Sequence, residues 1–204
     1  KIDADQDQIR VRGKLISVNK KVPTYVLALH KPRGVVTTVR DPQGRPTVMD
    51  LVPNNLKLFP VGRLDLNSEG LLLMTNDGDL ALKLTHPKYE VPKVYEVKIR
   101  GNLDDKKIAH LRKGVNTVEG KFKGAEVLSV NEVTREGVKK FQVVVKVFEG
   151  KNHHVRKMFD SIHCRVIRLK RIMMGSVALK GIARGGFRVL SRPEIQKLRM
   201  SVSS

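Results

Sequence analysis

The sequence is short of the residues that would place it in several common classes of protein. Its single cysteine, Cys164, excludes an internal disulfide, and the six histidines show no convincing zinc-ligand spacing with it. We therefore expect a reducing compartment and no structural metal. There is also no long apolar run and no Lys-rich amphipathic helix with a large exposed apolar side, so an anionic membrane is the less favoured partner.

Acidic residues are scarce relative to basic ones. Twenty Asp and Glu stand against forty Lys and Arg, and the resulting net charge of +20 is far more than solubility requires. The segment from Lys151 to Arg199 carries thirteen basic residues and only two acidic ones, Asp160 and Glu194. Such clustering predicts a face that tracks phosphates, so a nucleic acid is the expected partner.

The length and the ends of the chain set further limits. With 204 residues and 40% hydrophobic content, the chain can bury one substantial core or two small ones that share an interface. It opens on Lys1 rather than Met, and no signal-peptide hydrophobic region follows. We therefore expect that the true start is missing and that targeting is unreadable.

Segments in which apolar and polar residues alternate, as in a β-strand, outnumber segments with helical periodicity along the chain. Residues 7–16 indicate an exposed hairpin around a glycine, and residues 104–113 a short polar helix. Asp77 and its neighbours can cap a helix that Pro87 stops, Asn152 is a candidate N-cap for a helix reaching Ile162, and Ser191 is one for a final helix. Strands are expected at residues 25–29, 35–39, 58–61, 71–75, 93–100, 125–133, 138–148, 166–173 and 187–190.

Five segments occur in an order that resembles the successive motifs of bacterial-type ribosomal RNA pseudouridine synthases. They are KPRG at residues 31–34, GRLDLNSEG at 62–70, LLMTNDG at 72–78, KVY at 93–95 and EGKNHHVRKM at 149–158, followed by Leu169, Arg171 and Gly175. The resemblance covers residues 29–198. The form Asn-x-x-Val-Arg-x-Met is similar to that of the branch named for ribosomal small subunit pseudouridine synthase A, which includes several large-subunit enzymes.

This resemblance implies an α+β fold, with a mixed, mostly antiparallel bent β-sheet, flanking helices and two subdomains around a central cleft. Members of that branch usually carry an N-terminal S4 RNA-binding domain. Residues 1–24 are accordingly interpreted as the end of an S4-like module and its linker, and residues 25–200 as the catalytic domain.

Asp65 is the candidate catalytic carboxylate. Breaking the N-glycosidic bond of uridine and reattaching uracil through C5 requires a carboxylate at the junction of sugar and base, either attacking C1′ or removing the C2′ proton. To stay ionised in a partly dry pocket it needs a neighbouring cation, and Arg156 is the candidate partner. Without the motif, Asp65 would be read as a loop carboxylate bonded to backbone N–H groups, and Arg156 as one more solvated helix residue.

Three further residues acquire roles from the resemblance. Tyr95 lies on the apolar face of an alternating strand and would stack on the target base, although a plain core role fits it as well. Leu169 would pack beneath the base, and is in any case a core residue. Arg63 would fill the space left by an extruded nucleotide, or would contact phosphate, or would be a surface charge.

The remaining candidates are RNA contacts. Lys31 and Arg33 flank Pro32 in a tight loop from which their charges are expected to project outward. This suits contact with the RNA backbone, which is favoured, but also ordinary solubility. The adjacent pair His153 and His154 points in two directions about 100° apart, so RNA contact or plain surface is favoured over a shared metal ion. The further expected contacts are Lys151, Asn152, Lys157, Arg168, Lys170 and Arg171.

Isomerisation rearranges the nucleoside without net redox change, so no cofactor, metal or nucleotide energy is expected. The expected partner is ribosomal RNA, with a slight preference for the large subunit, either free or within a pre-ribosomal particle. A monomer is favoured, and no membrane association is expected. The expected compartment is the bacterial cytoplasm, or an organelle with bacterial-type ribosomes. The rival interpretation is a non-catalytic RNA-binding assembly factor with the same fold, which the charge of +20 would serve equally well.

Overall fold

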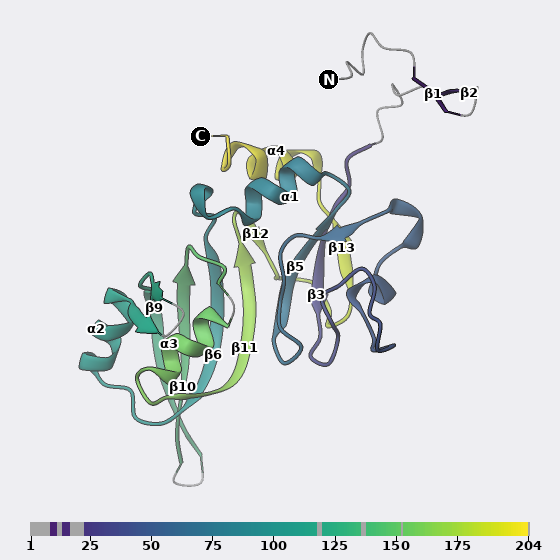
Figure 1. Ribbon diagram of the computed structural model, residues 1–204. Coiled ribbons are helices and arrows are strands. Elements are labelled where there is room, and N and C mark those ends of the chain that lie inside the picture. The colour runs from purple at the N-terminus through teal and green to yellow at the C-terminus, as the bar shows by residue number, and fades with distance from the viewer. Residues whose placement is uncertain are drawn as a thin grey trace.

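A large mixed sheet dominates the structure, which is a computed structural model of the chain (Figure 1). It describes residues 9–11, 14–16, 23–117, 120–135, 138–151 and 153–203. Within these ranges the sheet has nine strands, seven of them in the order β13-β3-β5-β11-β6-β10-β9, with β4 paired to β5 and β12 to β11. Only β11 and β5 run parallel, so the predicted mixed, mostly antiparallel α+β architecture is confirmed.

The elements follow the predicted order. The strands of the large sheet are β3 (Val26–Lys31), β4 (Phe59–Pro60), β5 (Glu69–Thr75), β6 (Lys93–Arg100), β9 (Glu126–Arg135), β10 (Val138–Val147), β11 (Arg165–Met174), β12 (Val177–Ala178) and β13 (Phe187–Val189). The helices are α1 (Gly78–Thr85), α2 (Asp105–Lys113), α3 (His154–Asp160) and α4 (Arg192–Met200), with 3-10 turns at Val48–Leu51, Asn54–Leu56 and Pro87–Tyr89. Two small hairpins join β1 (Ile9–Val11) to β2 (Lys14–Ile16) and β7 (Val115–Thr117) to β8 (Gly120–Phe122).

The sheet buries both of its faces around β3 and β5. Alternate residues of a strand point to opposite faces, so Leu27 and Leu72 join one apolar cluster while Ala28 and Leu71 join another. The first cluster extends under α3, and the second under α1 and α4, which lie together at one end of the sheet (Figure 1). Burial on both faces explains why these two strands read as nearly continuous apolar runs.

Helix starts are set by polar side chains close to the predicted positions. Asp77 accepts a hydrogen bond from Leu80 N at the start of α1, and Glu194 accepts one from the backbone N–H of Ser191 at the start of α4. The predicted cap of α3 is wrong. That helix begins after His153, which holds a left-handed backbone with φ of 53°, while Asn152 lies outside the described residues.

The strand predicted at residues 35–39 does not form. Val36 makes a single bridge to Thr47, and the segment bends back over the loop that carries Leu64. Thr37 Oγ1 donates to the carbonyl of Leu64 at 2.7 Å and accepts from its N–H. The β-branched residues of this run therefore brace a neighbouring loop instead of joining a ladder.

The predicted hairpin at the beginning of the chain is confirmed as the pair β1 and β2. Its turn and the linker at residues 17–22 lie outside the described residues, so the S4-like assignment of residues 1–24 stays a prediction. No helix in the described part of the chain is long and apolar enough to cross a membrane.

Candidate active site

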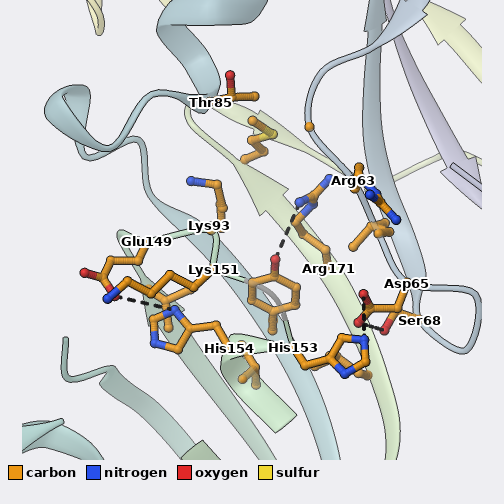
Figure 2. Close-up of a pocket in the computed structure, with 18 of the residues that line it drawn as sticks. Arg63, Asp65, Ser68, Thr85, Lys93, Glu149, Lys151, His153, His154 and Arg171 are labelled. Atoms are coloured by element: carbon orange, nitrogen blue, oxygen red, sulfur yellow. Dashed lines mark hydrogen bonds and ion pairs between the residues drawn. The ribbon is translucent and has the colours of Figure 1, made fainter. Parts of the chain in front are cut away.

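A cavity of about 440 Å³ opens between the loop after β4 and the strands β6 and β11. One wall is the loop at residues 61–68, the base is formed by residues of β6 and β11, and the opposite wall is the segment that leads from β10 into α3. The lining residues used below are Arg63, Asp65, Ser68, Lys93, Tyr95, Glu149, Lys151, His153, His154, Leu169 and Arg171. Figure 2 shows Asp65, Ser68 and His153 grouped on one side of it.

Asp65 lies in a tight turn that its own backbone closes. The Ser68 N–H donates to the Asp65 carbonyl at 3.0 Å, and Gly62, with φ of 70°, lets the chain turn into the loop. One carboxylate oxygen accepts from Ser68 Oγ at 3.4 Å, and the other lies 3.4 Å from His153 Nε2. The side chain is 32% exposed, so the predicted catalytic carboxylate lines the cavity and keeps contact with solvent.

Lys31 does not contact solvent, contrary to the prediction that its charge projects outward. It is completely buried, and Nζ donates to the carbonyls of Pro32, Asp65 and Ser68 at 3.0, 3.1 and 2.9 Å. Burial, only partly offset by the charges of Asp65 and Glu69, lowers the pKa of Lys31 to about 8. The ammonium holds the turn that carries Asp65 and cannot serve as an RNA contact.

Arg156 faces the same turn, but not in the predicted way. Its guanidinium donates to the Asn67 carbonyl at 3.2 Å and to Ser68 Oγ at 3.4 Å. Within the described ranges it forms no ion pair with Asp65 inside 4.0 Å, and the imidazole of His153 occupies that position instead. The left-handed backbone at His153 turns its ring toward Asp65 while α3 carries Arg156 toward the following residues.

Tyr95, Leu169 and Arg171 form the buried base of the cavity. Tyr95 on β6 is directly opposite Arg171 on β11, so both side chains leave the same face of the sheet. Arg171 is 3% exposed; Nε donates to the Leu71 carbonyl at 2.7 Å and Nη1 to Tyr95 Oη at 3.5 Å. Arg171 is therefore a poor candidate for a phosphate contact, and the RNA contact predicted for it stays a prediction.

The other predicted RNA contacts lie at different places. Arg63 and Lys151 line the cavity and are exposed, and Arg33 is exposed on its loop. Arg168 is tied to the buried carboxylate of Glu69, which Arg184 also approaches. Lys157 and Lys170 are half-buried, the former with its ammonium 5.8 Å from the ring centre of Phe122, and Asn152 lies outside the described residues.

Four residues of the cavity were not predicted to lie in the catalytic pocket, although the two histidines were considered as RNA contacts: Lys93, Glu149, His153 and His154. Burial, reinforced by the charge of Arg171, lowers the pKa of Lys93 to about 8. His154 is buried against Phe122, which overturns the expectation of a surface residue, and burial lowers its pKa as well. Lys93 and His154 stand inside the motifs already recognised, so their positions, though not their burial, were available as a signal.

Comparison with known proteins bears directly on this site. The sequence profile described as RNA pseudouridylate synthase matches residues 25–161. The protein named ribosomal large subunit pseudouridine synthase B of Bacillus subtilis is 38% identical over 196 residues, which cover 95% of this chain and 78% of the relative. The protein of the same name from Escherichia coli K12 is 39% identical over 197 residues, covering 94% of this chain and 66% of the relative.

Solved structures agree in fold. The chain is similar to a structure titled crystal structure of pseudouridylate synthase, with a TM-score of 0.76 and 28% identity over 97% of this chain and 82% of that one. Human RNA pseudouridylate synthase domain containing 1 shares the fold with a TM-score of 0.51 at 13% identity, covering 94% and 93% of the two chains.

Proposed function

Because the chain belongs to the RNA pseudouridylate synthase family, we propose that it isomerises a uridine of ribosomal RNA to pseudouridine. The names of the relatives, which refer to the large ribosomal subunit, support large-subunit RNA as the substrate. The observation that carries the proposal is the carboxylate of Asp65 at the side of a cavity whose base is formed by Tyr95 and Leu169.

The reaction needs few groups because atoms are only rearranged. The bond from C1′ to N1 breaks, a bond from C1′ to C5 forms, the proton on C5 leaves and N1 gains one. Asp65 acts at the ribose, either as a nucleophile at C1′ or as a base at C2′, and both routes use an ionised carboxylate. Neither route requires a cofactor.

The target nucleotide has to leave its stack before Asp65 can reach the sugar. Extrusion costs unstacking energy, and the base then needs a partly apolar pocket to enter. Tyr95 provides an aromatic ring and Leu169 an aliphatic side chain at the base of such a pocket, both nearly buried. Exposed Arg63, two residues before Asp65, is suited to occupy the vacated position in the RNA.

Phosphate contacts would come from the exposed basic residues around the cavity. Arg33, Arg63 and Lys151 meet this condition, and the net charge of +20 supports a long-range attraction to RNA. The partner is then ribosomal RNA, free or within a pre-ribosomal particle, and the protein acts as a monomer where bacterial-type ribosomes are assembled.

The test is quantitative pseudouridine mapping of ribosomal RNA from cells that contain or lack the protein, with Asp65→Asn compared to wild type. We expect one uridine to be modified only with wild type, and purified Asp65→Asn to keep the thermal midpoint of wild type. Asp79→Asn is the matched control, because Asp79 is exposed on α1 and lies away from the cavity. Identical maps with and without wild-type protein would favour the non-catalytic assembly factor.

A further inference from the structure

The guanidinium of Arg171 has an unused donor in the base of the cavity. A guanidinium carries five N–H groups, and burying one without an acceptor costs free energy. Nε is bonded to the Leu71 carbonyl and Nη1 reaches the Tyr95 hydroxyl, but Nη2 is inaccessible to solvent and has no hydrogen-bond partner among the described residues. The free protein therefore keeps a buried cation incompletely satisfied.

The surroundings of Arg171 add positive charge instead of neutralising it. Lys93 also lines the cavity, is nearly buried, and donates to the Val91 carbonyl at 2.9 Å. Within the described part of the chain, Arg171 forms no ion pair inside 4.0 Å. In Figure 2 Arg171 lies between Lys93 and the group of Asp65, Ser68 and His153. Nη2 of Arg171 is thus a donor for which the described residues of this part of the cavity supply no acceptor.

We propose that Arg171 recognises the extruded uracil, with Nη2 donating a hydrogen bond to a carbonyl oxygen of the base; the inference rests on the proposed function. A phosphate is the poorer occupant, because Arg171 is 3% exposed and lies beside the apolar side chains of Leu169 and Met174. A phosphate would lose its hydration there, whereas a neutral base brings carbonyl oxygens at little cost. Asp65 holds the sugar, and Arg171 reads the base.

The symmetry of uracil makes such a contact usable throughout the reaction. Its two carbonyls flank N3, and half a turn of the ring about the axis through C6 and N3 brings C5 to the place of N1. The same turn exchanges O2 and O4. A donor directed at one carbonyl position therefore has an acceptor both before and after the isomerisation.

The same contact distinguishes uridine from cytidine. Cytosine carries an amino group in place of O4, so at one of the two positions it would place N–H against N–H. A site built to donate a hydrogen bond rejects an analogue that lacks the acceptor far more strongly than an apolar pocket does. Arg171 is thus assigned as a specificity-determining residue for the base.

The experiment measures single-turnover pseudouridine formation on the RNA fragment that contains the mapped uridine. Three substrates are compared, with uridine, 2-thiouridine or 4-thiouridine at the target position, because sulfur is a weaker hydrogen-bond acceptor than oxygen. Wild type, Arg171→Met and Arg171→Lys are each assayed on all three. Arg165→Met is the control, because Arg165 is an exposed arginine of the same strand that does not line the cavity.

For wild type and Arg165→Met we expect at least one thio substrate to react about tenfold more slowly than uridine. For Arg171→Met this slowing should shrink to within about twofold, since the donor is gone. Slowing of equal size in wild type and Arg171→Met would overturn the proposal and leave Arg171 a purely structural residue. If Arg171→Met does not fold, Arg171→Leu, which also lacks the donor, takes its place, whereas Arg171→Lys keeps a donor and should retain the slowing. If neither Arg171→Met nor Arg171→Leu folds, equal rates of wild type on all three substrates overturn the proposal.

This design separates the two proposals. A wild-type protein that forms no pseudouridine on the unmodified RNA contradicts the proposed function itself. A wild-type protein that is active, but whose thio slowing does not depend on residue 171, contradicts only the role given to Arg171.

Discussion

Replacing Lys31 with methionine should reveal how the turn that carries Asp65 is held in place. The ammonium of Lys31 is fully buried and donates to three backbone carbonyls, those of Pro32, Asp65 and Ser68. Methionine fills nearly the same volume and donates nothing. The substitution Lys31→Met therefore removes the three hydrogen bonds while keeping most of the packing.

Two opposing terms set the size of the effect. Hydrogen bonds from a charged donor contribute about 1.5–3 kcal/mol each, and the three carbonyls would be left without this partner. Against this, burying the ammonium has a cost of about 3 kcal/mol, which follows from the fall of the Lys31 pKa from 10.5 to about 8. We expect Lys31→Met to lower the free energy of unfolding by about 2–4 kcal/mol. For a chain of this length that corresponds to a fall of about 5–15 °C in Tm.

The pH dependence gives the reasoning a second, independent check. Because the pKa of Lys31 is about 8 when folded and 10.5 when unfolded, the unfolded chain binds more protons between these values. This group therefore adds stability as the pH rises from 8 toward 10.5. Lys93 behaves in the same direction but is present in both proteins, so it cancels when they are compared. The stability difference between wild type and Lys31→Met should widen over this window.

The assay is urea unfolding of both proteins at pH 7.5 and at pH 9.5, followed by circular dichroism. Lys83→Met is the matched control, because Lys83 is exposed on α1, and its midpoint should stay close to that of wild type. Equal midpoints for Lys31→Met and wild type at pH 7.5 would refute the account of Lys31 as the anchor of the turn. A difference that narrows at pH 9.5 would refute the assignment of its lowered pKa.

Two further predictions concern the elements around the cavity. Gly70→Ala would place a Cβ 2.2 Å from the backbone oxygen of Arg171, at a residue whose φ is 112°. We therefore expect it to lower the free energy of unfolding, measured with urea, by about 3 kcal/mol or more. The control Gly78→Ala, with open space around the new Cβ, should change the free energy of unfolding by less than about 1 kcal/mol. Arg156→Ala should lower the single-turnover rate while RNA affinity stays within about threefold of wild type, because its contacts are the backbone and hydroxyl beside Asp65; an equal loss in a filter-binding measurement would mean that it binds phosphate.

Much of the fold followed from local sequence patterns. The strict alternation of residues 93–100 predicted β6 with its bounds and turned Tyr95 inward, as the structure confirms. The cap at Asp77 and the stop at Pro87 predicted α1 for the same reason, since both depend on residues only a few positions apart. The family was predicted from the order of its motifs, and the profile match and the relatives confirm it.

The predictions that proved wrong concern residues whose structure depends on contacts with residues far away in the sequence. The run of β-branched residues at 35–39 has the composition of a strand. However, Thr37 hydrogen-bonds to the backbone of Leu64, and the β-bridge described for the segment is the single one from Val36 to Thr47. Lys31 looked exposed because lysines usually are, and nothing near it in sequence announces that carbonyls from residues 65 and 68 converge on it. The local sequence pattern indicates which secondary structure a segment favours. Whether a charged side chain is buried depends instead on which backbone carbonyls the fold brings close to it.

The geometry of Asp65 indicates that substrate completes the site. In the free protein its carboxylate meets a half-exposed imidazole and a hydroxyl, both at 3.4 Å, and remains one-third exposed. Such contacts with solvent access hold a carboxylate only loosely. The buried donor of Arg171 is unsatisfied at the same time. An extruded uridine that enters the cavity would exclude water from Asp65 and supply an acceptor to Arg171, so that one ligand meets both deficiencies and strengthens the electrostatic interactions of the carboxylate.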